Sequence, residues 1–350
     1  IDEVHEMTDS KVYDAIKQSQ STKLEPLIFI ITTEGVVTQG FLDNKLSYVR
    51  KLIKGEINDE HILPWLYTQD SVEEIYQDKR TWQKSNPSLG TVKLESYLED
   101  MMNKSKNDHA MKVTMLCKDF NIKQTDQGAW LEFSDLNNLD TYKMSEVKDS
   151  YAIGGVDLSN TTDLTVAILL IVKGGKKYVL SQYFMPADVL EKRKEEDNAP
   201  YDIWLSKGLI TLTPGSQNDF SLVTSWFIKM IREHGIRPLW IGYDPWNSLY
   251  WVKEMEEAGF TLEKVRQGIF SLSEPMKQLE ADLKNKLVNY NNNPMMKWNL
   301  ANTQAKVDIN GNIQPSKLGS KFKRIDGAVA LIIAYAVLNR YKQEYEGMMR

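Results

Sequence analysis

The sequence predicts an α/β fold in two parts, of which the C-terminal part has a mixed sheet with flanking helices. Two apolar, β-branched runs joined by a polar turn, residues 153–158 and 164–172, are typical of a β-hairpin. A helical pattern over 220–235 leads into another short apolar run at 239–243, which predicts a crossover to a strand parallel to the first. One sheet therefore contains strands of both directions.

The N-terminal part is predicted to begin with a helix and a buried strand. Residues 9–20 have a helical composition, and the apolar run at 27–31 (LIFII) has the length of a buried strand. Residues 38–54 carry apolar side chains near helical spacing and predict a second helix. This alternation is typical of an α/β domain.

Two more helices, at 92–104 and 108–120, are predicted to complete the N-terminal domain, which we place at residues 1–120. The polar stretch that follows is rich in Asp and Asn, and we interpret residues 121–148 as a linker. The second domain is predicted to occupy residues 149–350.

The second domain is predicted to open with an antiparallel meander, because a third strand at 177–184 follows the hairpin after a Gly-Gly turn. Two short charged helices and a brief strand precede the crossover; they are predicted at 187–196, 201–207 and 210–212. After the crossover, the predictions are a helix at 247–258, a strand at 261–265, a helix at 272–289, a short strand at 298–301, a loop at 305–322 and a final helix from Ile325.

Three acidic residues occupy unusual places in these predicted elements. Asp157 lies within an apolar strand, where an unpaired carboxylate costs several kcal/mol. Asp244 ends the strand at 239–243, and Asp326 lies in the first turn of the final apolar helix. If the fold brings them together, their mutual repulsion opposes full ionisation unless a cation is present. Carboxylate ligands favour Mg²⁺ or Mn²⁺, and two such ions about 4 Å apart suit attack on a phosphodiester.

Composition excludes some classes of protein. The 350 residues carry a net charge of −5, so the chain as a whole has no basic footprint for nucleic acid. The net charge does not exclude a local basic groove for nucleic acid. Basic residues cluster near the final helix, at Lys317, Lys321, Lys323 and Arg324. The single cysteine, Cys117, rules out a disulfide within the chain, and four scattered histidines do not suggest a zinc site. No apolar run approaches the ~20 residues of a membrane span, and no signal-peptide pattern is present.

Three stretches resemble the nuclease domain of the large terminase subunit of tailed bacteriophages. They are GVDLSNTTDLTVAILL, GYDPW and NGNIQPSKLGSKFKRIDGAVALIIAYAV. The resemblance covers about residues 150–345 and implies a ribonuclease H-like fold. In this family the three metal-binding acids lie on the first strand, at the end of a central strand and at the start of the last helix. The matching residues are Asp157, Asp244 and Asp326.

The resemblance extends to the N-terminal part. Asp2 and Glu3 resemble the end of a Walker B segment, in which Asp helps to hold Mg²⁺ with ATP and Glu orients the attacking water. A strand followed by Thr32-Thr33-Glu34-Gly35 also matches the family pattern. No Walker A sequence occurs in the chain, which resembles a large terminase cut just before Walker B. We therefore expect the C-terminal part of a P-loop ATPase domain that binds ATP poorly as it stands.

The implied function is phage DNA packaging, with metal-dependent endonucleolytic cleavage of concatemeric double-stranded DNA. Asp157, Asp244 and Asp326 are the expected catalytic ligands of two Mg²⁺ or Mn²⁺ ions, and Glu3 is the expected catalytic residue of the intact ATPase. The family's partners are the portal protein and the small terminase subunit, and its large subunit works as a homo-oligomeric ring on the procapsid. The expected location is the host bacterial cytoplasm, with no membrane association.

Several alternatives remain open at this point. Asp163 is either a further metal ligand or a turn-forming residue. Ser159, Asn302 and Lys317 are weaker candidates for phosphate contact. Trp246, Tyr250 and Trp251 are predicted to pack in the core or against helices, with base stacking as the alternative. The protein as a whole is alternatively another ribonuclease H-like nuclease, such as a resolvase or transposase, or a non-catalytic DNA-binding or assembly module. The sequence does not indicate headful or site-specific cutting.

Overall fold

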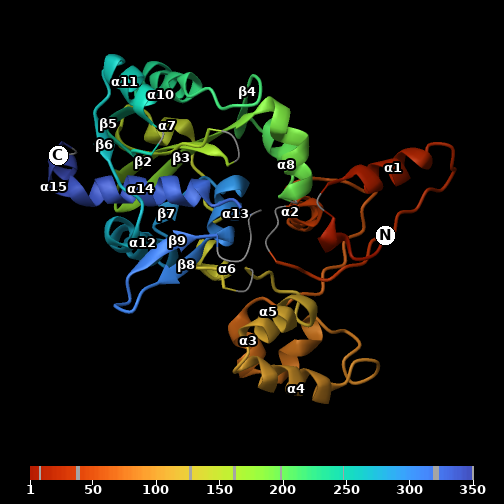
Figure 1. The fold of residues 1–350 in the computed structure, drawn as a ribbon. Coiled ribbons are helices and arrows are strands. Elements are labelled where there is room, and N and C mark those ends of the chain that lie inside the picture. Colours follow the sequence, from red (N-terminus) through yellow and green to blue (C-terminus); the bar gives the residue numbers. More distant parts are fainter. Residues whose placement is uncertain are drawn as a thin grey trace. The chain divides into compact units, whose positions relative to one another are not determined.

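The computed structural model describes residues 1–7, 9–36, 40–125, 128–160, 163–197, 199–246, 248–317 and 323–348 (Figure 1). The chain forms two compact units: Ile1–Gln127 with Asn198–Pro200, and Gly128–Asp197 with Tyr201–Arg350. Some predicted features lie outside the described residues, namely the turn residues Thr161 and Thr162, the helix starts at Thr38 and Asn247, and Lys321.

The second unit is built on a mixed sheet, as the sequence predicts. Its described strands are β1 (Tyr151–Asp157), β2 (Thr165–Lys173), β3 (Lys176–Pro186), β4 (Ile210–Thr213), β5 (Arg237–Tyr243), β6 (Leu262–Lys264) and β7 (Val288–Asn289). The strand order is β4-β3-β2-β1-β5-β6, and β7 pairs with β3. β1, β2 and β3 form the predicted antiparallel meander, and β5 lies parallel to β1. The crossover through residues 220–235 is thus confirmed.

Helix α14 (Asp326–Arg340) packs directly on the sheet (Figure 1). It contacts β1, β2 and β5, and α12 (Ile269–Lys284) and α13 (Pro294–Asn302) pack against it as well. Because it is covered on both sides, its residues from 326 to 335 are all buried. Two glycines make room for it: a Cβ on Gly155 would approach the Ala330 carbonyl oxygen to 2.2 Å, and one on Gly242 would approach Ile333 to 2.7 Å.

We expect Gly155→Ala to lower the free energy of unfolding by about 2–3 kcal/mol, because the added methyl meets helix backbone that cannot give way. Chemical denaturation followed by circular dichroism would measure the loss. Gly347→Ala is the matched control, since the Cβ that it would add meets no atom within 4 Å among the described residues outside its own helix turn. Equal stability of the two variants would show that α14 does not need this close approach.

The opposite face of the sheet carries α10 (Ser221–His234) and α11 (Leu249–Glu257). Their buried side chains join those of β1, β2 and β5 in one apolar core, with Val156, Phe227 and Trp251 among its members. The remaining described helices of this unit are α6 (Phe133–Leu136), α7 (Met144–Val147), η3 (Ala187–Val189), α8 (Leu190–Glu196), α9 (Tyr201–Ser206) and α15 (Lys342–Met348).

Three predictions for the C-terminal part were wrong in detail. Residues 298–301 belong to helix α13 rather than to a strand, because Pro294 starts a helix that the Asn293 side chain caps. The predicted helix at 272–289 ends at Lys284, since Lys286 adopts a left-handed φ of 56° and the chain then enters β7. The described part of the predicted loop at 305–322 contains an antiparallel hairpin, β8 (Gln304–Val307) and β9 (Ile313–Ser316).

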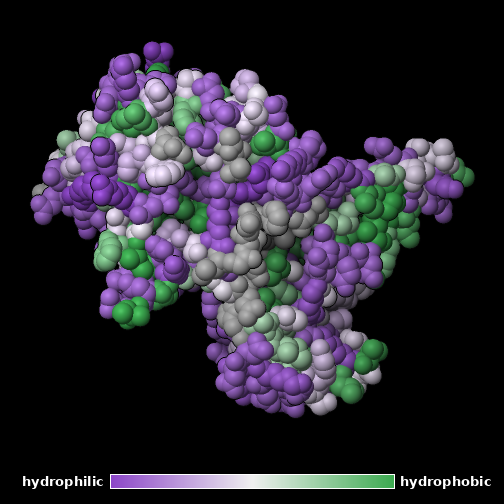
Figure 2. Space-filling model, in the orientation of Figure 1, coloured by the Kyte–Doolittle hydropathy of each residue, from purple (hydrophilic) through white to green (hydrophobic). Residues whose placement is uncertain are grey.

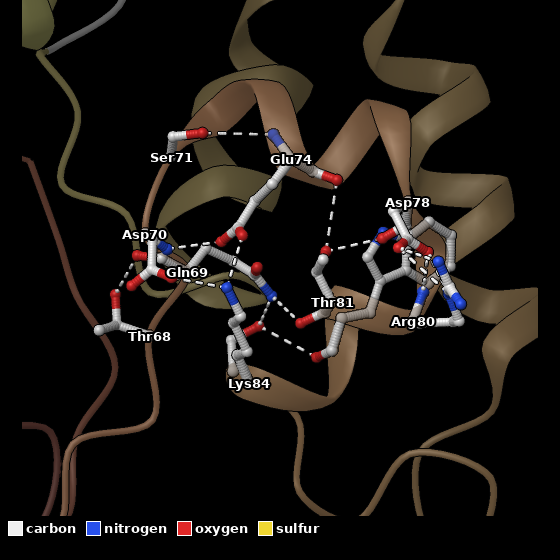
Figure 3. A network of polar contacts seen from close by, with 11 residues as sticks. Thr68, Gln69, Asp70, Ser71, Glu74, Asp78, Arg80, Thr81 and Lys84 are labelled. Atoms are coloured by element: carbon white, nitrogen blue, oxygen red, sulfur yellow. Dashed lines mark hydrogen bonds and ion pairs between the residues drawn. The ribbon is translucent and has the colours of Figure 1, made fainter.

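The first unit is mainly helical. Its described helices are η1 (Val4–Glu6), α1 (Lys11–Ser19), α2 (Phe41–Ile53), α3 (Val72–Gln77), η2 (Lys79–Lys84), α4 (Glu95–Ser105) and α5 (His109–Lys118). Caps and ion pairs support two of the short ones, α3 and η2 (Figure 3). The Ser71 hydroxyl accepts a hydrogen bond from the Glu74 amide at 3.3 Å, and the Lys84 ammonium pairs with Asp70 and Glu74 at 2.6 Å each. Such contacts fix helix ends, because a short helix has few hydrogen bonds of its own.

The predicted buried strand at 27–31 was wrong. Leu27 is 78% and Phe29 is 70% exposed, and Ile31 forms only an isolated bridge with Asp2 among the described residues. The apolar run is therefore extended but lies at the surface, where Figure 2 shows hydrophobic atoms over the N-terminal segment. None of the described helices has the length and apolar character needed to cross a bilayer.

Candidate functional site

Asp157 and Asp244 are brought together by the pairing of two parallel strands. Asp157 is the last residue of β1, and Asp244 directly follows β5. The register pairs Val156 with Tyr243, so the next residue of each chain lies at the same edge of the sheet. Gly155 and Gly242 face α14, and by the alternation of strand sides both aspartates are directed to that face.

Asp163 and Asp326 reach the same edge from other elements. Asp163 precedes β2, whose antiparallel register pairs Val166 with Asp157. The Ser159 hydroxyl accepts a hydrogen bond from the Asp163 amide at 3.0 Å and so helps to hold this turn. Asp326 is the first residue of α14, the helix that lies on this face of the sheet.

All four acidic residues line one pocket of about 590 Å³. We call it the acidic pocket and define it by Asp157, Asp163, Asp244 and Asp326; Lys317 and Trp246 also line it. The sequence predicted that residues far apart along the chain would converge here. Among the described residues, no group of three or more His, Cys, Asp or Glu side chains is placed so that it could hold one metal ion.

Burial in the acidic pocket raises the pKa of three of its four carboxyl groups. Burial, followed by the charge of Asp326, raises the pKa of Asp157 well above its ordinary range, while Lys317 acts in the opposite direction. Burial raises the pKa of Asp326 to about 6, again against the effect of Lys317. Burial also raises the pKa of the half-buried Asp244. A cluster of this kind gains from an added positive charge.

Asp163 differs from its neighbours because two basic side chains, those of Lys317 and Arg324, contact it closely. Its Oδ1 atom lies 2.9 Å from the Lys317 ammonium and also accepts a hydrogen bond from the Arg324 guanidinium. Although burial opposes ionisation, these two partners hold the pKa of Asp163 below its ordinary value. Asp163 therefore ionises more readily than Asp157, Asp244 and Asp326. Whether it serves as a ligand or as a structural residue stays a prediction.

Arg324 connects Asp163 of the acidic pocket to a second buried carboxylate, Asp197. It is only 2% exposed, and it donates to both carboxylate oxygens of Asp197 at 2.7 Å each. Asp197 is itself buried and also accepts a hydrogen bond from the Tyr201 hydroxyl at 2.6 Å. The sequence did not single out Asp197, because an acidic residue that follows a charged helix gives no signal of burial.

One atom of the acidic pocket lacks a partner. Oδ2 of Asp326 is buried and makes no hydrogen bond to any residue that the structure describes. A buried carboxylate oxygen without a partner is costly. A carboxylate oxygen is a ligand that hard divalent cations favour, and three further aspartates line the same pocket.

Two aromatic residues that were predicted to lie in the core are exposed instead. Trp246 is 78% and Tyr250 is 91% exposed, whereas Trp251 is buried as predicted. The reason is the amphipathic character of α11, which turns Trp251 toward the sheet and Tyr250 to solvent. Trp246 thus forms part of the pocket wall, where a bound substrate can reach it.

The weaker phosphate-contact candidates separate into two groups. Ser159 and Lys317 line the acidic pocket. Asn302 instead donates a hydrogen bond to the Arg324 carbonyl at 3.3 Å, which gives it a structural role.

Asp2 and Glu3, the residues expected to serve ATP hydrolysis, belong to the first unit. Both are exposed, and the Asp2 carboxylate accepts a hydrogen bond from the Glu3 amide at 2.8 Å. Glu3 has a left-handed φ of 51°, and its carboxylate lies 3.0 Å from the His5 ring. Their role in nucleotide chemistry stays a prediction.

Comparison with known proteins identifies the class. The family model described as "Terminase large subunit, endonuclease domain" matches residues 56–341. The chain therefore belongs to the terminase large subunit endonuclease family, and this membership connects it with phage DNA packaging.

Individual relatives agree with the family. The chain is 25% identical over 340 residues to the terminase large subunit of Enterobacteria phage HK97, covering 95% of this chain and 65% of that protein. It is 23% identical over 363 residues to Protein YmfN of Escherichia coli (strain K12), covering 98% of this chain and 78% of that protein. The crystal structure of the HK97 bacteriophage large terminase is similar with a TM-score of 0.52 at 23% identity, over 96% of this chain and 69% of that one.

The structural similarity bears on the fold. It supports the mixed α/β architecture that the sequence predicts for the second unit, and the preceding unit is consistent with the ATPase-like part of terminases.

Proposed function

We propose that this chain hydrolyses the backbone of double-stranded DNA with divalent metal ions, as the nuclease part of a phage packaging terminase. The observation that carries the proposal is the acidic pocket. Four carboxyl groups from four separate segments line it, and one of them has a buried oxygen with no hydrogen-bond partner in the described part of the chain. Membership in the terminase endonuclease family supports nuclease chemistry at this place.

Asp157, Asp244 and Asp326 are the proposed ligands of Mg²⁺ or Mn²⁺, with Asp163 as a further ligand or a support. A pair of such ions, when bound, supplies an activated water and stabilises the leaving oxygen of a phosphodiester. The chain's own part is to hold the carboxylates at one edge of a rigid sheet and to bury two of them, so that their charge favours a cation over water.

The remaining functions of an intact large terminase are proposals for the whole protein. They comprise ATP hydrolysis with Mg²⁺ through Asp2 and Glu3, assembly as a ring on the procapsid, and work with the portal protein and a small terminase subunit in the host bacterial cytoplasm.

The test is a plasmid-nicking assay of the whole chain with Mn²⁺ or Mg²⁺ and with EDTA. We expect nicking only with metal and its loss in Asp157→Ala, whereas Asp188→Ala, which removes an exposed carboxylate of the same unit, should keep it. Metal-independent nicking, or full activity of Asp157→Ala, would contradict the proposal.

The same assay separates the alternatives. A resolvase would prefer branched DNA to linear duplex, which parallel assays of both substrates would reveal. A non-catalytic DNA-binding module would bind duplex without cutting it at any metal concentration.

A further inference from the structure

We propose that Lys317 is the resident counter-ion of the acidic pocket, which competes with the divalent cation and pairs with a DNA phosphate once the cation has displaced it. This inference rests on the proposed metal site and adds the residue that would control its occupancy. Lys317 reaches the pocket from outside the main sheet, because it directly follows strand β9 of the β8–β9 hairpin.

The position of the ammonium group is the first observation. It lies 2.9 Å from Oδ1 of Asp163 and 3.9 Å from Oδ1 of Asp326, so it stands between two of the proposed ligands. The side chain is 28% exposed and therefore extends from solvent into the pocket. An ammonium group at this place occupies the space in which a cation would be bound.

The second observation is electrostatic. Lys317 favours the ionised forms of Asp157, Asp163 and Asp326 alike. A divalent cation bound to the same oxygens would do the same with twice the charge. Because the two positive charges repel each other at this range, the ammonium has to leave when the cation binds.

The third observation distinguishes Lys317 from the other base at this site. Arg324 is buried and held by two hydrogen bonds to Asp197, so it cannot move without breaking the fold around it. Lys317 is a compact charge on a flexible stem that is partly in solvent. Of these two partners of Asp163, Lys317 is therefore the exchangeable one.

The displaced ammonium needs a new anion, and the substrate provides one. Lysine binds phosphate as a point charge without demanding a fixed geometry. Trp246, exposed on the pocket wall, marks the side from which a substrate can enter. Cation binding and DNA binding thus become coupled, because the cation frees the charge that the phosphate then takes up.

The test measures Mn²⁺ binding to the whole chain without DNA, by isothermal titration calorimetry and by the electron paramagnetic resonance signal of free Mn²⁺. We expect Lys317→Gln to bind Mn²⁺ ~10-fold more tightly than the wild type. Lys317→Arg should stay close to the wild type. Lys306→Gln is the matched control, because it removes the same charge from an exposed position on the same hairpin.

A second readout is duplex DNA binding in Ca²⁺, which avoids dependence on cleavage. Lys317→Gln should weaken it ~10-fold in the presence of the cation and change it little in EDTA. Unchanged or weaker Mn²⁺ binding by Lys317→Gln would overturn the counter-ion assignment while leaving the metal site intact. If the wild type does not bind Mn²⁺, the proposed function is refuted. The proposed competition between Lys317 and the cation is then refuted as well.

Discussion

Replacing Asp326 with Asn is expected to abolish DNA cleavage and, in the same molecule, to make the metal-free protein more stable. The loss of a carboxylate that neutralises a catalytic ion removes several kcal/mol of transition-state stabilisation, or ~10³-fold in rate. The gain in stability arises because Asp326 is buried, Asp163 also disfavours its ionisation, and its Oδ2 atom has no hydrogen-bond partner within the described ranges. Plasmid cleavage with Mn²⁺ and thermal unfolding in EDTA measure the two effects.

The pH dependence of the stability difference follows from the pKa of Asp326, which burial raises to about 6 in the folded protein. The unfolded value is about 4, so ionisation destabilises the fold progressively as the pH rises between these values. At about pH 7.5 we expect Asp326→Asn to be more stable by about 1–2 kcal/mol, or ~2–6 °C in Tm. Near pH 4 the two proteins should unfold alike, because the wild-type carboxyl group is then protonated.

Asp188→Asn provides the control for this prediction, since it removes an exposed carboxylate from the same unit. It should change neither cleavage nor Tm by much. A variant Asp326→Asn that cuts DNA within tenfold of the wild-type rate would remove Asp326 from the catalytic machinery. A variant that is less stable at every pH would mean that the carboxylate supports the fold.

The sequence indicated Asp157, Asp244 and Asp326, which line one pocket, because strong local patterns surround them; metal binding by these residues stays a prediction. An apolar strand that contains Asp157, and an apolar helix that begins with Asp326, are unusual enough to be noticed in one sequence. The direction of β5 followed from the helical crossover, and parallel pairing then placed Asp244 beside Asp157.

The sequence failed where burial depends on what the rest of the chain supplies. The apolar run at 27–31 has the composition of a core strand, yet among the described residues only its residue 31 forms a β-bridge, and Leu27 and Phe29 are exposed. In the same way, Trp246 was predicted to be buried although it lines the acidic pocket. The hydrophobicity of a side chain indicates a tendency to be buried. Whether the side chain is buried depends on contacts with residues that are distant in sequence.

Ion pairs across the fold were equally hard to predict. Arg324 and Asp197 are 127 positions apart, and their bond depends on the meeting of the end of α8 with the start of α14. The sequence indicated a basic cluster near residue 324 and suggested a DNA-binding groove. Instead, Arg324 is directed inward and holds two carboxylates.

Arg324→Met should therefore be among the most destabilising changes in the second unit. Removing one partner of a buried ion pair costs about 3–5 kcal/mol, because the other charge stays buried without compensation. Here that charge is Asp197, whose side chain is fully buried and would keep the Arg193 guanidinium, 3.8 Å away, as its remaining basic partner among the described residues. Denaturation in EDTA, followed by the circular dichroism of the whole chain, would measure the loss. Arg340→Met, which breaks a half-exposed pair with Glu263, should cost less than about 1 kcal/mol.

Two further variants test whether the uncompensated charge is the cause. Arg324→Met combined with Asp197→Asn should recover a large part of the lost stability, because the neutral amide can still accept from Tyr201. Arg324→Lys keeps the charge but not the two parallel hydrogen bonds, so it should fall between the wild type and Arg324→Met. If the double variant is as unstable as Arg324→Met, the arginine acts through packing of its side chain rather than through Asp197. In that case the start of α14, and with it Asp326, is held in place by shape rather than by charge.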